Sequence, residues 1–160
     1  MSVTNVKEYL KKWGRDKDVM EFETSSATVE LAAQALGVEP ARIAKTISFK
    51  DKDGAMVIVA AGDAKTDNGK FKAEFGFKAK MLSPDEVLNY TGYAVGGVCP
   101  FGTKSDISVY LDVSLKRFET VFPACGSSNS AIRLTCDELN EYSHNKKWVD
   151  VCKGWENGTM

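Results

Sequence analysis

The sequence predicts an α+β fold, in which helices flank a mixed and mostly antiparallel sheet of about six to seven strands. Two apolar runs, residues 45–50 and 55–61, enclose a short polar turn, which is typical of a hairpin. Stretches with helical spacing of apolar residues occur between further short strand-like runs. No repeat, low-complexity stretch or linker interrupts the 160 residues, so we expect one domain over residues 1–160.

The first segment, residues 1–24, is predicted to hold one helix and one strand. Apolar residues recur at helical spacing through residues 3–13, and Gly14 is suited to end that helix. Residues 19–23 alternate between apolar and polar side chains, as a short strand does.

A second helix is predicted to begin after Ser25 or Ser26, either of which can cap its N-terminus, and to end at Gly37. The hairpin follows, with Asp53 and Gly54 in its turn. The apolar stripe of the second helix consists of Val29, Ala32, Ala33 and Leu36.

Two more helices are predicted after the hairpin. Phe71 and Phe75 are four residues apart within the lysine-rich segment 65–80, which indicates a helix with one apolar side. Ser83 and Glu86 form a capping box at the start of the next helix.

The C-terminal part is predicted to add strands and one last helix. Thr135 and Glu138 form a capping box that opens this helix, and residues 144–160 are interpreted as a C-terminal tail. Three strands are predicted before and at this point, at residues 107–112, 119–124 and 131–135.

Composition excludes several classes of function. The chain has 21 Lys and Arg against 22 Asp and Glu, so a uniformly basic protein that coats nucleic acid is not expected. His144 is the only histidine, which rules out a metal site built from several histidines and leaves a single candidate for any imidazole base. This histidine lies in a polar stretch, so we interpret it as a surface residue.

The cysteines and the N-terminus point to a cytoplasmic protein with reduced thiols. No apolar segment resembles a leader or a membrane span, so no membrane partner is expected. No pair of cysteines has the C-x-x-C spacing of a zinc ribbon or a redox dithiol, so we expect no metal and no cofactor. The four cysteines are Cys99, Cys125, Cys136 and Cys152.

Three features are candidates for function, and the residues alone leave an alternative open for each. The glycine-rich segments 96–102 and 125–130 are either structural turns or loops that bring backbone groups close to a ligand. Lys45 is either a cation that faces a ligand or a charged residue that protects a strand edge. Cys99 in the first loop is a further candidate, as a thiol nucleophile.

The order of motifs resembles one known family. The motifs are AAQALGV, IAKTISF, a hairpin ending in GD, GYAVGGVCPFG and GSSNSAIRLTCDEL. Over about residues 25–140 they resemble the YbaK / prolyl-tRNA-synthetase-associated domain family of trans-editing aminoacyl-tRNA deacylases. The resemblance implies a strongly curved mixed sheet with flanking helices.

The resemblance also implies roles for individual residues. Lys45 matches the family's key lysine, and Gly96, Gly97 and Pro100 match its G-x-x-x-P loop, which orients the substrate carbonyl and the terminal ribose. Position 99 is often a small or hydroxyl residue in this family, whereas here it is cysteine. The remaining positions implied to bind substrate are Thr46, Asp63, Val98, Cys99, Gly126, Ser127 and Ser128.

The implied activity is hydrolysis of the ester bond of a mischarged tRNA, with Cys- or Ala-tRNA(Pro), or a Ser- or Thr-charged tRNA, as candidate substrates. The implied partners are the acceptor end of tRNA and an aminoacyl-tRNA synthetase. An aminoacyl ester is already activated, so positioning and charge stabilisation suffice for its hydrolysis without a histidine base. Two alternatives remain: a non-catalytic module that binds a nucleotide or aminoacyl-tRNA, and a thiol enzyme that uses Cys99.

Overall fold

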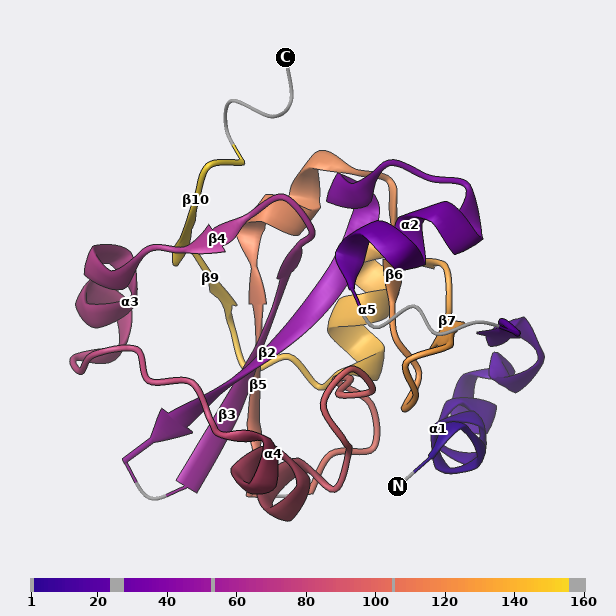
Figure 1. Cartoon of the computed structure of the whole chain (residues 1–160), viewed down its shortest axis with the longest axis horizontal. Coiled ribbons are helices and arrows are strands. Elements are labelled where there is room, and N and C mark those ends of the chain that lie inside the picture. The colour runs from indigo at the N-terminus through magenta and orange to yellow at the C-terminus, as the bar shows by residue number, and fades with distance from the viewer. Residues whose placement is uncertain (1, 24–27, 53, 105, 156–160) are drawn as a thin grey trace.

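The computed structural model describes residues 2–23, 28–52, 54–104 and 106–155, and its centre is a six-stranded mixed sheet (Figure 1). The strand order is β8-β6-β2-β3-β5-β9. Within this sheet two pairings are antiparallel and three are parallel, and the two small ladders described next add two antiparallel pairings. In chain order, the strands of this sheet are β2 (Ile43–Asp51), β3 (Gly54–Ala61), β5 (Ser108–Asp112), β6 (Thr120–Pro123), β8 (Leu134–Thr135) and β9 (Trp148–Val149).

Two small two-stranded ladders lie beside this sheet. The first joins β1 (Met20–Glu21) to β7 (Ser130–Ala131), and the second joins β4 (Lys65–Thr66) to β10 (Cys152–Lys153). Each ladder ties a segment near one end of the chain to a segment far from it in sequence.

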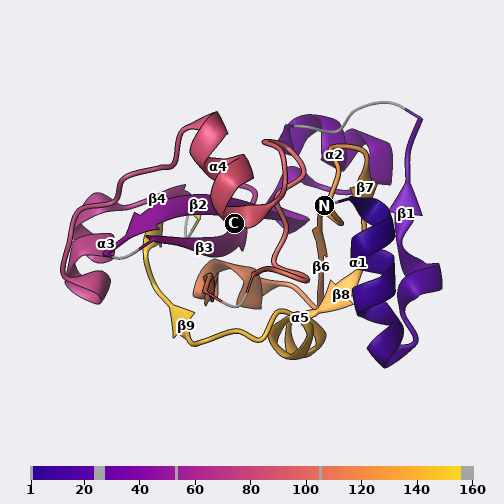
Figure 2. The ribbon, with the colours of Figure 1, turned by 90° about the horizontal axis from the view of Figure 1, so that it is seen from below.

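The helices cover both sides of the sheet (Figure 2). Helices α2 and α4 lie on one side and α5 lies on the other, while α1 stands beside β1 at one end of the molecule. The bounds are α1 (Val3–Leu10), α2 (Val29–Leu36), α3 (Asn68–Phe75), α4 (Pro84–Thr91) and α5 (Cys136–Tyr142), with 3-10 turns η1 (Lys11–Trp13), η2 (Asp16–Asp18), η3 (Pro40–Arg42) and η4 (Val113–Arg117). No helix among the described residues is long and apolar enough to cross a membrane.

The hairpin β2–β3 is confirmed and forms the longest pairing in the sheet, from Ala44 opposite Ala61 to Asp51 opposite Gly54. Gly54 is therefore the first residue of β3 and not part of the turn, and Asp53 lies outside the described residues. Residues 55–61 are all buried, because β3 lies between β2 and β5 and the sheet is covered on both sides.

The predicted capping boxes at Ser83 and Thr135 are both present. The cap of α2 differs from the prediction: the hydroxyl of Thr28 accepts the backbone N–H of Leu31 at 3.1 Å. The two serines predicted as caps, Ser25 and Ser26, lie outside the described residues.

Two predictions about the C-terminal part were wrong. The strand expected at residues 131–135 is two strands, because β7 pairs with β1 while β8 pairs with β6. The segment interpreted as a tail, residues 144–160, contributes β9 next to β5 and β10 next to β4. Strands of two residues are too short to show an alternating pattern, so tertiary pairing alone defines them.

Candidate active site

The candidate site is built on an open stretch of the edge of β2. Strand β6 pairs with β2 only at Ile43 and Ala44. Further along, the chain near Met81 joins the same edge, where Leu82 N–H donates to the Ser48 carbonyl at 3.1 Å. Between these two contacts, residues 45–47 have a strand partner only in β3 among the described pairings.

The direction of the backbone groups along this edge follows from the alternation of a strand. The Ser48 carbonyl and the Lys50 N–H both bond outward, to the segment 80–82. Successive residues of a strand direct their N–H and C=O groups to opposite edges. Thr46 has the same parity as Ser48 and Lys50, so its backbone N–H and C=O face the open stretch.

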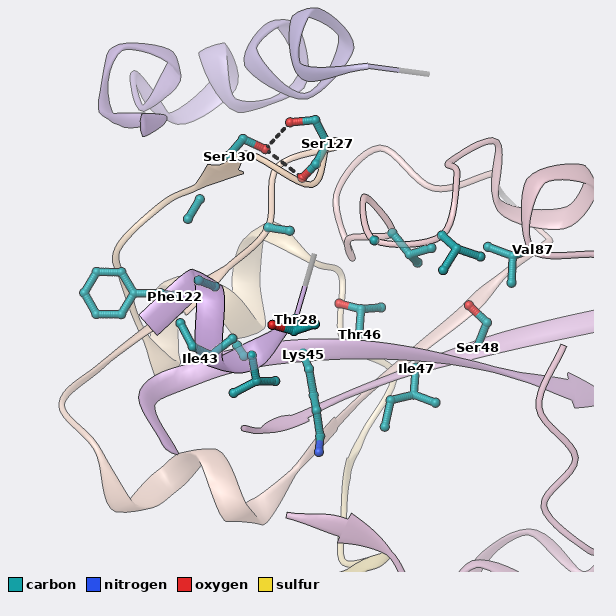
Figure 3. Close-up of a pocket in the computed structure, with 18 of the residues that line it drawn as sticks. Thr28, Ile43, Lys45, Thr46, Ile47, Ser48, Val87, Phe122, Ser127 and Ser130 are labelled. Carbon is teal, nitrogen blue, oxygen red and sulfur yellow. Dashed lines mark hydrogen bonds between the residues drawn. The ribbon is translucent and has the colours of Figure 1, made fainter. Parts of the chain in front are cut away.

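A cavity of about 350 Å³ occupies this region (Figure 3). Its lining is mostly apolar and comes from α2, from the start of α4 with the residues before it, and from the two glycine-rich loops. The lining residues outside β2 include Val29, Ala32 and Leu36 of α2, Leu82, Pro84 and Val87, Val95, Gly96 and Val98 of the first loop, and Phe122, Ala124, Ser127 and Ser130.

Lys45 carries the only ionisable side chain among the described residues that line the cavity. Its ammonium group donates to the carbonyl oxygens of Gly62, at 3.4 Å, and Ala64. Figure 3 shows that Lys45 points to one side of β2 while Thr46 and Ser48 point to the other. Partial burial lowers the pKa of Lys45, because removal from water disfavours the charged form.

The hydroxyl of Thr46 is buried and has no hydrogen-bond partner among the described residues. A buried polar group without a partner costs about 1–3 kcal/mol in free energy of unfolding. This hydroxyl lies in the wall of the apolar cavity, so a polar group of a bound molecule is the natural partner for it.

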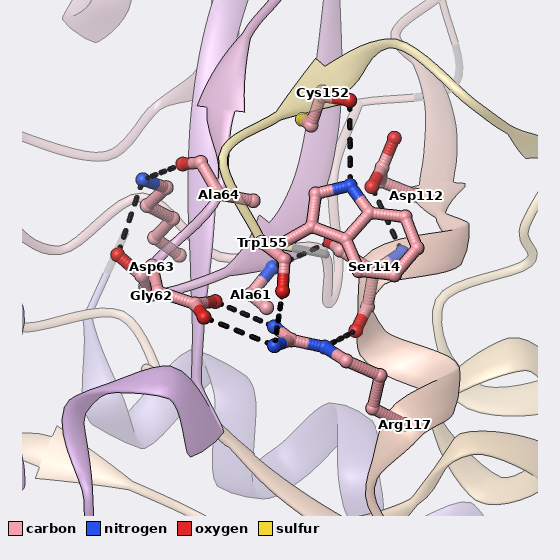
Figure 4. A network of polar contacts seen from close by, with 10 residues as sticks. Ala61, Gly62, Asp63, Ala64, Asp112, Ser114, Arg117, Cys152 and Trp155 are labelled. Carbon is pink, nitrogen blue, oxygen red and sulfur yellow. Dashed lines mark hydrogen bonds and ion pairs between the residues drawn. The ribbon is translucent and has the colours of Figure 1, made fainter. Parts of the chain in front are cut away.

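Asp63 lies outside the lining of the cavity and is held by Arg117 (Figure 4). Two hydrogen bonds, of 2.5 and 3.0 Å, join its carboxylate oxygens to the guanidinium group. The structure does not place Asp63 at the cavity, and its contact with substrate stays a prediction. Its position is between Gly62 and Ala64, whose carbonyls bind the Lys45 ammonium, so Asp63 fixes the turn that holds Lys45.

The structure brings the two glycine-rich loops into direct contact. A Cβ atom at Gly97 would lie 2.9 Å from the Gly126 carbonyl oxygen and 3.0 Å from the Ser127 Cα. Gly126 has a φ of +95°, and a Cβ there would lie 2.9 Å from the Ser2 carbonyl oxygen. These two glycines permit close packing, while Gly96, Val98 and Ser127 face the cavity.

Six of the residues predicted to form the site do not line the cavity: Asp63, Gly97, Cys99, Pro100, Gly126 and Ser128. Cys99 is fully buried in the core, and its thiol lies 3.8 Å from the Phe101 carbonyl oxygen. Burial raises the pKa of Cys99 to about 11. The contact of Cys99 with substrate stays a prediction, and the geometry argues against a thiol enzyme because this thiol is both protonated and inaccessible.

Several lining residues were missed by the sequence analysis. Ser48 follows Thr46 by two residues and so shares its face of β2, a signal that the alternation of the strand contained. Ser130 accepts the Cys125 N–H at 3.2 Å and lies 2.9 Å from the Ser127 hydroxyl. Its part in the site depends on the fold of the second loop, which no local pattern reveals.

Comparison with known proteins now identifies the family. The model of the aminoacyl-tRNA editing domain matches residues 23–142. The chain belongs to this family. The match includes both glycine-rich loops, Lys45 and α2, which together surround the cavity, and ends at the last residue of α5.

Relatives of this editing domain include proteins with and without an assigned activity. A Bacillus subtilis protein named only as uncharacterized, YwhH, is 62% identical over 98% of this chain and 100% of its own length. EbsC of Enterococcus faecalis, named as a candidate Cys-tRNA(Pro)/Cys-tRNA(Cys) deacylase, is 30% identical over 83% of this chain and 77% of its own. The crystal structure of a candidate trans-editing enzyme for prolyl tRNA synthetase superposes with a TM-score of 0.85 and 31% identity, covering 95% of this chain and 97% of that one.

Proposed function

We propose that this editing domain is a cytoplasmic, trans-acting aminoacyl-tRNA deacylase, which hydrolyses the ester of a tRNA that carries the wrong amino acid. One observation carries the proposal: an apolar cavity of about 350 Å³, open at the edge of β2, in which Lys45 is the only ionisable group of the described lining and the Thr46 hydroxyl lacks a partner. Family membership supports the reaction class.

Different groups of the cavity have different roles in ester hydrolysis. The carbonyls that hold the Lys45 ammonium are neutral, so a phosphate or a developing oxyanion is a stronger acceptor. To reach a substrate in the cavity, the Lys45 side chain must turn from these carbonyls around the open edge of β2. The outward backbone groups of Thr46 and the first glycine-rich loop orient the ester and the terminal ribose. Attack on the ester carbonyl then comes from water or from a nucleophile on the substrate itself, since the described lining contains no carboxylate, thiol or imidazole.

The substrates that fit best are tRNAs charged with a small amino acid, first among them Cys- or Ala-tRNA(Pro). The apolar lining favours a small side chain of low polarity, and the names of EbsC and of the trans-editing structure point to the same tRNA. Ser- and Thr-charged tRNAs are the competing substrates, because the serines of the second loop offer hydroxyl groups. Because the protein has a net charge of −1, we expect its affinity for tRNA to be modest. A synthetase partner would raise this affinity.

The experiment is deacylation of a panel of tRNAs charged with Cys, Ala, Ser, Thr and the cognate amino acid. The wild-type protein is compared with Lys45→Ala and with Lys50→Ala, which removes a lysine of the same strand that pairs with Glu86 outside the cavity. We expect Lys45→Ala to lose about a hundredfold in rate and Lys50→Ala to retain activity. Equal deacylation rates for Lys45→Ala and wild type would overturn the mechanism. If the protein binds tRNA but hydrolyses no member of the panel, a non-catalytic module would be favoured.

A further inference from the structure

A second cavity, of about 370 Å³, lies where the first glycine-rich loop ends. None of its lining residues lines the first cavity. It is formed by α1, the segment before β5, and the chain just after α5. The lining residues are Tyr9, Gly102, Thr103, Lys104, Ile107, Ser108, Val109, Ser143, His144 and Lys146.

The described lining of this cavity has basic side chains and no acidic ones. Lys104, His144 and Lys146 contribute the basic groups. None of the three forms an ion pair with a described residue, and the Lys104 ammonium donates only to the Asn89 carbonyl oxygen, at 3.0 Å. Unpaired cations around a cavity attract an anion.

A buried donor without a partner also belongs to this cavity. Ser143 is 2% exposed, and its hydroxyl has no hydrogen-bond partner in the part of the chain that the structure describes. The hydroxyls of Thr103 and Ser108 are further donors in the same lining. A buried hydroxyl is costly unless it is paired, so the cavity offers a bonding site that the protein itself leaves unfilled.

The carbonyls at the helix end beside the cavity are hydrogen-bonded within the protein, which weakens their repulsion of an anion. The last four carbonyls of a helix ordinarily lack partners and carry partial negative charge. Here the carbonyls of residues 139–142 accept hydrogen bonds from Ser143 N–H, Asn145 N–H, His144 N–H and the Tyr9 hydroxyl. The negative end of α5 is thereby satisfied within the protein.

The backbone at His144 is the only case among the described residues of a residue other than glycine at positive φ, with a value of +53°. This left-handed conformation costs about 1 kcal/mol for a residue with a side chain, and glycine is favoured at such positions. Because this position is histidine and not glycine, an imidazole lies in the lining of the cavity.

We propose that this second cavity binds a phosphate group, as a monoester or a diester. A phosphate has several oxygens and accepts charge-assisted hydrogen bonds from lysine and histidine together with bonds from hydroxyls, which is the set of donors gathered here. The group comes either from a free phosphorylated molecule or from the backbone of RNA. The site is spatially separate from the first cavity, since the two share no lining residue.

The test is a titration of the protein with inorganic phosphate, followed by the backbone amide resonances of Gly102, Thr103, Ser143 and His144 in NMR spectra. We expect saturable shifts confined to these residues and their neighbours. Lys146→Ala and His144→Gly should each weaken binding at least about fivefold. The matched control is Lys147→Ala, which removes the adjacent lysine, whose ammonium pairs with Glu74 at 2.7 Å and does not line the cavity.

Two further ligands distinguish the sources of the phosphate. If the site serves RNA, an uncharged acceptor-stem hairpin should bind less tightly to Lys146→Ala than to Lys147→Ala, and ribose 5-phosphate should bind no better than inorganic phosphate. If the site serves a free molecule, ribose 5-phosphate should bind more tightly and RNA affinity should be equal in the two variants. The absence of saturable shifts, or equal weakening by Lys146→Ala and Lys147→Ala, would overturn the proposal.

Discussion

The carboxylate of Asp63 and the guanidinium of Arg117 form a two-point ion pair directly beside the carbonyls that bind Lys45. Arg117 also donates to the Ser114 carbonyl oxygen at 2.9 Å and to the Trp155 carbonyl oxygen at 3.1 Å. The turn after β3 is thus tied to η4 and to the C-terminal segment (Figure 4). Three parts of the chain that are distant in sequence together fix the position of the key lysine.

The first prediction concerns this ion pair. Replacing Arg117 with alanine leaves the Asp63 carboxylate without its partner, and the two side chains are only 11% and 24% exposed. We expect the free energy of unfolding to fall by about 2–3 kcal/mol in urea titrations. A double-mutant cycle with Asp63→Asn should give a coupling energy above about 1 kcal/mol. Strictly additive effects would show that the pair does not act as a unit.

The second prediction concerns the unpartnered hydroxyl of Thr46. Thr46→Val removes a buried donor that makes no bond in the free protein, so the free energy of unfolding should be unchanged or rise by up to about 1 kcal/mol. If the hydroxyl bonds the substrate, kcat/KM for deacylation should fall about tenfold in the same variant. Thr46→Ser keeps the hydroxyl and serves as the control. Full activity in Thr46→Val would remove this residue from the site.

The third prediction concerns the contact between the two loops. Gly97→Ala places a methyl group 2.9 Å from the Gly126 carbonyl oxygen, so one loop must shift. We expect a loss of about 2 kcal/mol in stability together with a fall in deacylation rate. Gly54→Ala is the matched control, because the nearest atom to its Cβ is a Tyr90 ring carbon at 3.9 Å. Thermal unfolding of both variants measures the difference, and equal stability would contradict the packing role of Gly97.

The fourth prediction concerns pH. Burial raises the pKa of Cys99 to about 11 and, with a contribution from Asp112, that of Cys152 to about 12, against an ordinary value of 9.0. Between pH 9 and these values the unfolded chain loses thiol protons that the folded protein keeps, so stability falls as pH rises. Each thiol should cost about 1 kcal/mol at pH 10 relative to pH 7.5.

Urea unfolding at the two pH values measures this loss in free energy of unfolding. In Cys99→Ala the loss should be smaller by the contribution of one thiol. The same burial predicts that iodoacetamide at pH 7.5 leaves Cys99 and Cys152 unmodified in the folded protein and leaves deacylation intact. Rapid loss of activity on alkylation of Cys99 would restore the thiol enzyme as an alternative.

Local chemistry in the sequence predicted much of the fold. The capping boxes at Ser83 and Thr135 and the apolar hairpin strands are short-range signals, and all of them are present in the structure. The strands β4, β9 and β10 were missed because each has two residues and exists only through a distant partner. Long-range pairing of this kind leaves no periodic pattern to detect.

The candidate site was predictable in part for the same reason. Family motifs located Lys45, Thr46, Gly96, Val98 and Ser127, all of which line the cavity. Motifs could not show that the carboxylate at position 63 forms an ion pair with Arg117, which is 54 positions away in the chain. Nor could they show that the thiol at position 99 is turned into the core, because the direction of a loop side chain depends on packing.

At the open stretch along the edge of β2, the cavity is bounded by main-chain groups on one side and by side chains on the others. The β2 part of the cavity includes the outward main-chain groups of Thr46, whose positions depend little on which side chains surround them. The other walls of the cavity consist of side chains of α2, α4 and the two loops. Substitutions in these walls can change which acyl group fits while the β2 part keeps its geometry. We therefore expect a few wall substitutions to change the selectivity of this protein without loss of the main-chain groups at the open edge of β2.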